Sequence, residues 1–140
     1  MLGERASVRL VADANVLLSA VIGGRAKAVL EHPSITEILR AEAMLVEVQE
    51  YATQPAAKKR LSRDVVMLAV ASLPVRVVER EIYEKSIPEA KRRIGRRDPD
   101  DVEILALALH VGAPIWSNDN DFEDAGVQWF TTAALLARLQ

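Results

Sequence analysis

The chain has 140 residues, the size of one domain, and 50% of them are hydrophobic, enough for one sizeable core. With 27% charged residues, six glycines, six prolines and no cysteine, the composition excludes disordered and collagen-like chains, disulfide scaffolds, thiolate zinc sites and cysteine nucleophiles. The net charge of −2 by itself predicts neither a nucleic acid nor an acidic substrate.

Strand and helix patterns alternate through the first half of the chain. Residues 8–12 are apolar and β-branched and predict a buried strand, followed by a turn into a helix that precedes Gly23-Gly24. Residues 35–39 predict a second short strand, and residues 41–53 repeat apolar side chains at the spacing of an amphipathic helix. A further helix is predicted over 64–73, with Ser62 as its N-cap and Pro74 as its stop.

The alternation continues in the second half. Because Pro88 interrupts a polar helical segment, residues 79–93 predict two short helices or one kinked helix. The clearest helix opens at Asp98-Pro99 and closes at Gly112, and its apolar part, 104–111, is typical of a helix packed on a sheet. Strands are predicted over 75–78, 114–116 and 127–130, and a last helix over 131–139.

This order of elements predicts an α/β fold with three layers, in which helices flank a central parallel β-sheet. We expect a single domain over residues 1–140, with no linker and no internal repeat. The longest apolar stretch, 104–116, is too short to cross a membrane, and Asp13 and Asn15 interrupt any secretory signal, so we expect a cytoplasmic protein. In a parallel sheet the ligand site lies beyond the carboxyl ends of the strands.

Carboxylates follow two of the predicted strands. Asp13 comes directly after the first strand, with Asn15 two residues later, and Asp119 follows the strand at 115–116, with Asp121 two residues later. Either acid could simply make a turn or cap a helix. Recurrence at two strand ends favours a site instead.

A second group of acids opens the helix at Pro99. This group consists of Asp98, Asp100 and Asp101. Helix capping and the helix dipole account for one or two of these carboxylates, and a third repels its neighbours, so a positive counter-ion is the natural complement of the group. Asp101 leads onto the side of the helix that faces the sheet, and we favour it over Asp100 as the inward acid.

In the predicted helix over 41–53, Glu42 and Glu47 flank the apolar stripe, and periodicity does not choose between them. If acids from these separate elements converge, they repel one another unless a cation neutralises them. An all-oxygen ligand set suits Mg²⁺ or Mn²⁺, and metal-assisted hydrolysis of a phosphodiester is the chemistry of such a cluster.

Four segments, in this order, resemble the PIN-domain nuclease family. They are VADANVL at 11–17, LVEV at 45–48, DPDD at 98–101 with LALAL at 105–109, and IWSND at 115–119. No single segment is specific, but the ordered set spans residues 8 to about 135.

The resemblance implies roles for particular residues. The four acidic metal ligands and catalytic residues would be Asp13, Glu47, Asp101 and Asp119. Asn15 and Ser117 match the small polar positions that support the first and last carboxylates, and Asp121 matches an auxiliary ligand. Because the DPDD segment carries two adjacent acids, Asp100 stays open as the alternative to Asp101.

The resemblance also implies an activity and partners. Members of the family are mostly Mg²⁺- or Mn²⁺-dependent endoribonucleases, and many are VapC-type toxins of toxin–antitoxin pairs that form homodimers. An RNA substrate, a cognate antitoxin and a homodimer are therefore expected here. The alternative is a PIN-like fold that has lost activity and binds RNA or protein.

A run of basic residues precedes the acidic helix start and offers phosphate contacts of its own. It consists of Lys91, Arg92, Arg93, Arg96 and Arg97. The competing interpretation is a solvated surface whose arginines pair with neighbouring acids such as Glu84, Glu89 and Asp98. Arg25 and Lys27 are weaker candidates for the same role.

The remaining residues of possible chemical interest receive no functional role. His32 and His110 lack the spacing of metal ligands. Trp116 and Trp129 lie in apolar, strand-like segments and are predicted to belong to the core. No stretch alternates aromatic and basic residues, so the sequence predicts no base-stacking platform.

Overall fold

The computed structural model describes residues 8–43, 62–95 and 99–139. In these residues five strands form one sheet in the order β3-β2-β1-β4-β5, and every neighbouring pair is parallel. The strands are β1 (Val8–Ala12), β2 (Ile35–Ala41), β3 (Arg76–Val78), β4 (Ile115–Trp116) and β5 (Trp129–Phe130). The parallel central sheet predicted from the sequence is confirmed.

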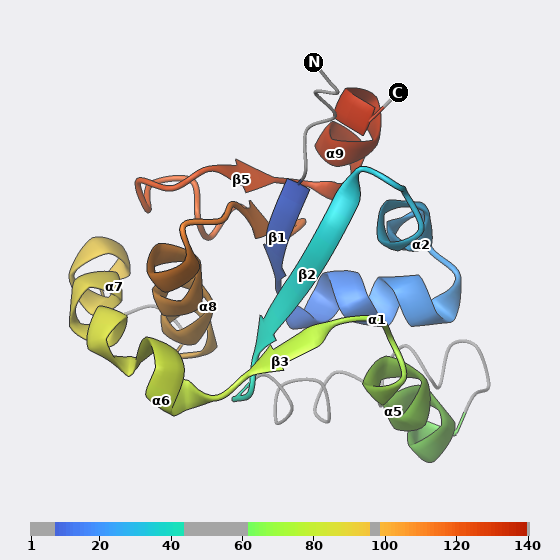
Figure 1. The fold of residues 1–140 in the computed structure, drawn as a ribbon, viewed down its shortest axis with the longest axis horizontal. Helices are drawn as coiled ribbons and strands as arrows, with labels where there is room; N and C mark the ends of the chain where they lie inside the picture. The colour runs from blue at the N-terminus through green and yellow to red at the C-terminus, as the bar shows by residue number, and fades with distance from the viewer. Residues whose placement is uncertain (1–7, 44–61, 96–98, 140) are drawn as a thin grey trace.

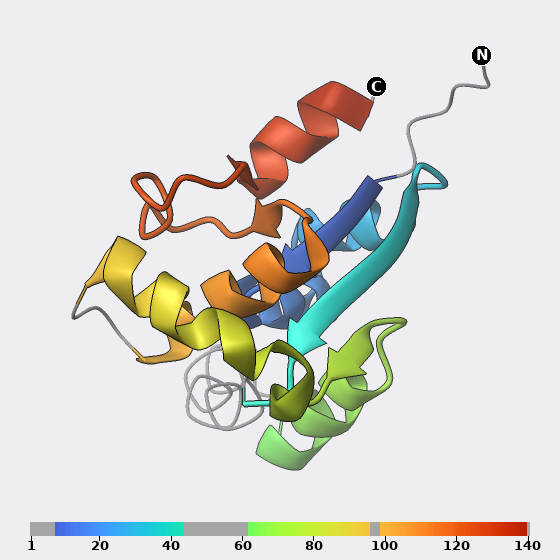
Figure 2. The same cartoon turned by 60° about the vertical axis from the view of Figure 1, so that its left-hand side comes forward.

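Helices cover both faces of this sheet, which gives the three expected layers (Figure 1). One face packs against α1 (Ala14–Ile22), α2 (Ala26–Leu30), α5 (Arg63–Ala71) and α9 (Thr132–Leu139). The other packs against α6 (Arg80–Tyr83), a 3₁₀ turn (Glu84–Ser86), α7 (Ile87–Ile94) and α8 (Pro99–Val111). Figure 2 shows α7 and α8 side by side on this second face.

The strand β1 contributes side chains to the hydrophobic cores on both faces of the sheet, because successive side chains of a strand point to opposite faces. Leu10 and Ala12 lie in the core under α1, α2 and α5, whereas Val11 lies in the core under α8. All three are fully buried, so β1 is the centre of the molecule and its end is fixed on both sides.

Local signals explain where α1 begins and ends. The side chain of Asp13 accepts a hydrogen bond from the backbone N–H of Val16 and so caps the helix. The helix ends at Gly23, whose φ of 99° is left-handed and favours glycine. The cap therefore fixes Asp13 at the end of β1.

The strands β2 and β5 differ most from the sequence-based prediction. The strand β2 continues to Ala41, because Arg40 and Ala41 pair with Val77 and Val78 of β3. A helix beginning at Ala41 is therefore wrong for residues 41–43, and the rest of that predicted helix lies outside the described residues. The strand β5 is shorter than predicted and covers only Trp129–Phe130.

The other predicted elements agree with the structure to within one or two residues at each end. Ser62 caps α5 through its Oγ, which accepts from the N–H of Val65, and residues 79–93 form two short helices joined by a 3₁₀ turn. Pro88 lies in the first turn of α7, where a proline leaves no intrahelical hydrogen bond unmade. Pro99 is the first residue of α8, and Gly112, with φ of 70°, follows the end of that helix.

The direction of α8 matters for the site. The residues just after this helix lead into β4 at the start of the strands, where the carbonyl of Pro114 accepts from the N–H of Val11. Because α8 packs along β1 and β2 and ends there, its first turn lies at the opposite edge, beyond the carboxyl ends of the strands. The chain thus brings Asp100 and Asp101 to the edge at which β1 and β4 end.

Candidate active site

Asp13 lies at the end of β1 and is held by two hydrogen bonds. Its Oδ1 accepts from the N–H of Val16 at 3.1 Å, and its Oδ2 accepts from the hydroxyl of Ser117, which follows β4. Ser117 is fully buried and Asp13 is only 4% exposed. The two neighbouring strands β1 and β4 therefore end in one hydrogen-bonded pair of side chains.

The environment of Asp13 opposes ionisation. Burial raises the pKa of its carboxyl from 3.8 to about 6, although the hydrogen bonds from Ser117 and Val16 lower it. The charge of Asp119 raises the pKa further. No lysine or arginine of the described residues forms an ion pair with Asp13. A cation at this position would offset the cost of the buried charge.

The turn after β4 carries the second acid and is fixed by a side chain of β5 and by a backbone N–H of α9. The N–H of Asp119 donates to the Oγ of Ser117 at 3.1 Å, so the same hydroxyl bridges Asp13 and the backbone of Asp119. The indole Nε1 of Trp129 donates to the carbonyl of Ser117 at 2.9 Å. The backbone N–H of Thr132 donates to the Oδ1 of Asn118 at 2.8 Å. The position of Asp119 thus depends on contacts with the last strand and helix.

The other predicted site residues lie at the same edge of the sheet as Asp13 and Asp119 or fall outside the described residues. Asp100 and Asp101 are partly buried in the first turn of α8, and Asp121 is partly buried in the turn after Asp119. Asn15 lies in the first turn of α1 with an exposed side chain, and its backbone N–H lowers the pKa of Asp13. Glu47 lies outside the described residues.

The structure brings two of the predicted acids to one hydroxyl: the Oγ of Ser117 donates to the carboxylate of Asp13 and accepts from the backbone N–H of Asp119. Across the described ranges 8–43, 62–95 and 99–139, no three Asp, Glu or His side chains form a group that could hold a metal ion. Asp101 is at the same sheet edge without completing such a group. The ligand set that includes Glu47 and Asp101 stays a prediction.

Glu42, which periodicity left open, follows β2 in a turn instead of lying on a helix. Its exposed carboxylate accepts from the backbone N–H of Arg80 at 3.4 Å. That contact places Glu42 beside α6, at the β3 side of the sheet edge. In this structure the carboxylate of Glu42 therefore accepts a hydrogen bond from the first residue of α6.

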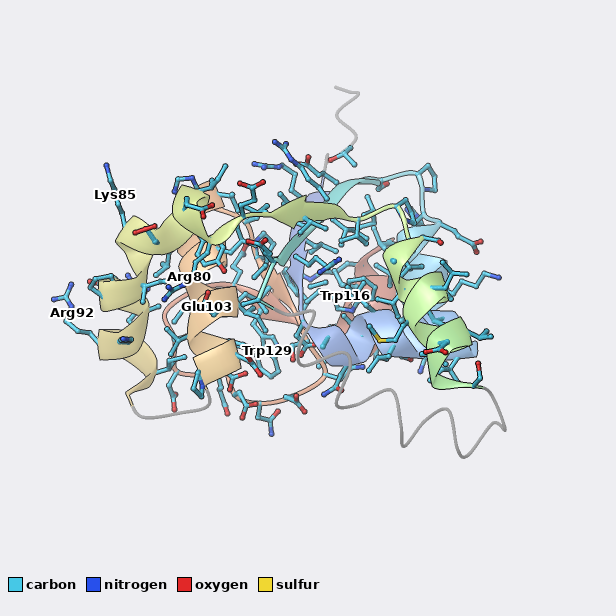
Figure 3. The ribbon with its side chains drawn as sticks, turned by 90° about the horizontal axis from the view of Figure 1, so that it is seen from below. Arg80, Lys85, Arg92, Glu103, Trp116 and Trp129 are labelled. Carbon is cyan, nitrogen blue, oxygen red and sulfur yellow. The ribbon has the colours of Figure 1, made fainter. Side chains whose placement is uncertain are left out.

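A polar network that the sequence did not reveal joins α6 to α8. The hydroxyl of the fully buried Tyr83 donates to Glu103 at 2.6 Å, and the Nε of Arg80 pairs with the same carboxylate at 3.3 Å. Burial and this hydrogen bond raise the pKa of the Tyr83 hydroxyl. Figure 3 shows Arg80 and Glu103 close together, while Lys85 and Arg92 point outward from α7 and the turn before it. The network anchors the part of α8 that carries Asp100 and Asp101.

A second residue not foreseen is Arg40, on β2 near the same edge. It is only 5% exposed, and its Nη1 makes no hydrogen bond. Burial lowers the pKa of its guanidinium. Nothing in the alternating pattern of β2 indicated that a charged side chain would face the interior.

The basic run divides into two kinds of residue. Arg93 donates from Nε to Glu89 at 2.9 Å and from Nη1 to the carbonyl of Ala125 at 3.0 Å, which ties α7 to the turn before β5. Arg92 also pairs with Glu89 but is 76% exposed. For these two residues the pairing with Glu89 favours the solvated-surface interpretation. Arg96 and Arg97 lie outside the described residues.

The tryptophans and histidines have structural surroundings. Trp116 is fully buried, as predicted, and its Nε1 donates to the Oγ1 of Thr132 at 3.0 Å. Trp129 is half-buried at the edge of the core under α8. His32 contacts the backbone at Ser34 and Leu139, and His110 is exposed on α8.

Comparison with known proteins places this geometry in context. The profile of the family described as PIN domain matches residues 11–140. No curated protein matches the sequence significantly. No helix in the described part of the chain is both long and apolar enough to cross a membrane.

Several solved structures share the fold at low sequence identity. PAE2754 from Pyrobaculum aerophilum is 15% identical with a TM-score of 0.69, and the match covers 95% of this chain and 90% of that one. VapBC2 from Rickettsia felis, bound to a DNA fragment from its promoter, is 14% identical with a TM-score of 0.64, covering 89% and 98%. A toxin–antitoxin complex from Klebsiella pneumoniae is 19% identical with a TM-score of 0.62, covering 88% and 97%.

Proposed function

This chain belongs to the PIN domain family, and from that premise we propose that it is a metal-dependent endoribonuclease. Its divalent ion, Mg²⁺ or Mn²⁺, is bound by Asp13, Asp119, Asp101 and Glu47, with Asp100 as the alternative to Asp101. The substrate is RNA, and the reaction is hydrolysis of a phosphodiester bond.

The observation that supports this proposal most is the burial of the Asp13 carboxyl without a cationic partner among the described residues. A carboxylate that is 4% exposed, lies beside a second acid and has no ion-pair partner among the described residues destabilises the fold when it is ionised. A hard divalent cation is the partner that would compensate for this, because such ions prefer carboxylate oxygen. The two carboxylates of Asp13 and Asp119 at this edge are the type of ligand that Mg²⁺ and Mn²⁺ prefer.

The protein side chains divide the work as follows. A divalent ion held by these carboxylates would supply positive charge that polarises the scissile phosphate and makes a water more nucleophilic. Ser117 orients the carboxylate of Asp13 and favours its ionised form, because its hydroxyl donates to Oδ2. The fixed turn at 117–119 holds Asp119 at a set position relative to Asp13. The oxygen of water bonds to phosphorus and the water gives up one proton. The bond from phosphorus to the leaving ribose oxygen breaks, and that oxygen takes up one proton.

We also propose that the chain is the toxin of a toxin–antitoxin pair and forms a homodimer. The support for the toxin role is the shared fold, because structures that resemble this one include a toxin–antitoxin complex and VapBC-1 from nontypeable Haemophilus influenzae, at 16% identity and a TM-score of 0.59. Expression of the chain alone should arrest growth, and co-expression of the gene beside it should restore growth. Normal growth on expression of active enzyme would favour an RNA-processing enzyme.

The central experiment measures cleavage of single-stranded RNA by the purified protein with Mg²⁺, Mn²⁺ or a chelator. We expect cleavage with either metal, none with the chelator, and none with Asp13→Asn. Asp64→Asn is the matched control, because Asp64 is an exposed acid in the first turn of α5. Binding of RNA without cleavage under any metal would instead favour the inactive binding module.

A further inference from the structure

A small pocket opens beside the candidate active site, between the α1–α2 turn and the start of α9. Its volume is about 270 Å³, and it is lined by Ser19, Arg25, Ala26, Asn118, Thr132 and Ala133. Asn118 lies between Ser117, which contacts Asp13, and Asp119. One wall of the pocket is thus part of the same turn that carries the second acid.

The pocket also lies close to Asp13, because both are at positions along α1. Asp13 caps this helix and Ser19 is six residues later, which corresponds to roughly 9 Å of helix rise. A strand of RNA whose phosphodiester is cleaved near Asp13 would therefore place a neighbouring nucleotide at this pocket.

The walls of the pocket are held by contacts within the fold. The N–H of Thr132 donates to the Oδ1 of Asn118, and the Oγ1 of Thr132 accepts from the buried Trp116. On the other side, the N–H of Gly24 donates to the carbonyl of Ser19 at 2.7 Å, and a Cβ at Gly24 would collide with the hydroxyl of Ser19. The absence of a side chain at Gly24 lets the turn approach α1 and brings Arg25 to the pocket.

The polar groups that remain available in the pocket are mainly hydrogen-bond donors. Because the Oδ1 of Asn118 accepts from Thr132, its amide group has two N–H donors left to offer. Arg25 is exposed, and no residue in the described part of the chain forms a hydrogen bond or ion pair with its guanidinium, which carries five donors. The pocket therefore favours a ligand edge that presents adjacent acceptors.

We infer that this pocket binds one base of the RNA next to the cleaved bond and that Arg25 and Asn118 select guanine there. Guanine presents two adjacent acceptors, N7 and O6, that match the fork of an arginine, whereas adenine offers an amino donor beside N7. The volume is just below the roughly 300–1,000 Å³ of pockets for drug-sized ligands, which suits a single base. The inference rests on the proposed nuclease function, since it names the specificity of that site.

The test is cleavage of a single-stranded RNA pool of random sequence with Mn²⁺, followed by sequencing of the products. We expect wild-type protein to enrich guanine at one fixed position beside the cut, by about tenfold over adenine. Arg25→Ala should reduce that enrichment several-fold while cleavage continues. Asn118→Ala should reduce both the enrichment and the cleavage, because the Oδ1 of Asn118 also helps to fix the turn that carries Asp119. Lys27→Ala is the matched control, because Lys27 is an exposed cation on α2 that does not line the pocket.

A binding measurement with Asp13→Asn protein separates base selection from general attraction to phosphates. Short single-stranded RNAs that differ only in guanine or adenine at the enriched position are titrated at two salt concentrations. We expect Arg25→Ala, added to this background, to weaken the guanine RNA more than the adenine RNA. Equal weakening of both, with a reduced salt dependence, would show a phosphate contact and overturn the base pocket.

The outcomes distinguish this inference from the function on which it rests. No cleavage of any RNA by the wild type overturns the nuclease, and the pocket assignment with it. Cleavage without a base preference beside the cut, or with a preference unchanged in Arg25→Ala, overturns the pocket alone. Melting temperatures of the variants near that of the wild type show that the pocket, not folding, was changed.

Discussion

The hydroxyl of Ser117 donates a hydrogen bond to the carboxylate of Asp13, although the two residues are 104 positions apart in the chain. The contact exists because β1 and β4 are neighbours in the sheet, with Ala12 paired to Trp116. Each residue is the first one after its strand. Strand order therefore creates the central feature of the candidate site, and the following predictions start from it.

Replacing Ser117 with alanine should weaken metal binding at Asp13. The Ser117 hydroxyl lowers the pKa of that carboxyl, so its removal raises the pKa and leaves less of the ionised form at neutral pH. We expect the Mn²⁺ concentration for half-maximal cleavage to rise about tenfold, the lower end of the effect of losing such a partner. Ser72→Ala, on exposed Ser72 after α5, should leave that concentration unchanged.

The stability of the metal-free protein should fall as pH rises from about 4 to above 6. The pKa of Asp13 is raised from 3.8 to about 6 in the fold, so the folded state binds its proton more tightly than the unfolded state. This contribution is fully present below the unfolded pKa and is lost as pH passes the folded pKa. A shift of this size corresponds to about 3 kcal/mol of unfolding free energy.

Urea unfolding of wild type and Asp13→Asn at several pH values measures this contribution. Asparagine can still cap α1, so the variant should fold but lack this part of the pH dependence. The difference in unfolding free energy between the two proteins should change across pH 4–7. A constant difference over that range would show that Asp13 is not protonated in the fold. Added Mg²⁺ should restore stability at pH 7 only in the wild type.

Alanine variants of Arg92 and Arg93 should have different effects on the free energy of unfolding and on RNA binding. Arg93→Ala removes the hydrogen bond to the carbonyl of Ala125 and should lower the unfolding free energy by about 1–2 kcal/mol. Arg92→Ala, on a side chain that is 76% exposed, should change it by less than about 0.5 kcal/mol. If the basic run contacts phosphates, Arg92→Ala also reduces the salt dependence of RNA binding by about one unit of slope.

The combined replacement of Arg92, Arg93, Arg96 and Arg97 by alanine should weaken RNA binding more at low salt than at high salt. Because Arg93 supports the fold, the same measurement on Arg93→Ala alone is the necessary control. Equal RNA binding by the fourfold variant at low salt would leave the run as a solvated surface.

Tyr83→Phe should destabilise the protein by about 1–2 kcal/mol, because it leaves Glu103 without its shortest hydrogen bond while the ring keeps its packing. Thermal unfolding and cleavage assays on the same variant test whether the network also matters at α8. We expect a lower melting temperature together with a moderate loss of cleavage, because Asp100 and Asp101 lie one turn or less before Glu103. Unchanged stability would show that the hydroxyl makes no net contribution.

Arg40→Met should stabilise the protein by about 1 kcal/mol. It removes a buried guanidinium whose Nη1 makes no hydrogen bond and keeps a side chain of similar length in the interior. Urea unfolding at neutral pH measures the change. A loss of stability in Arg40→Met would show that this cation has a favourable role in the folded state.

Much of the fold was predictable because it depends on local patterns. The apolar runs at 8–12 and 115–116, the Ser62 cap and Pro99 each act over a few residues, and the structure confirms the elements that they predicted. The end of β2 was not predictable from its own residues. Arg40 and Ala41 join the strand because β3, from a distant part of the chain, pairs with them.

The sequence alone determined the alternation of strands and helices, the acids after β1 and β4, and the ordered segments that resemble PIN domains, because burial and backbone hydrogen bonding repeat with short periods. Only the tertiary structure decided that Ser117 contacts Asp13, that Arg93 supports a turn, and that Arg25 and Asn118 share a pocket. Such contacts join residues far apart in the chain. No local period encodes them, since they follow from the order in which strands assemble into the sheet.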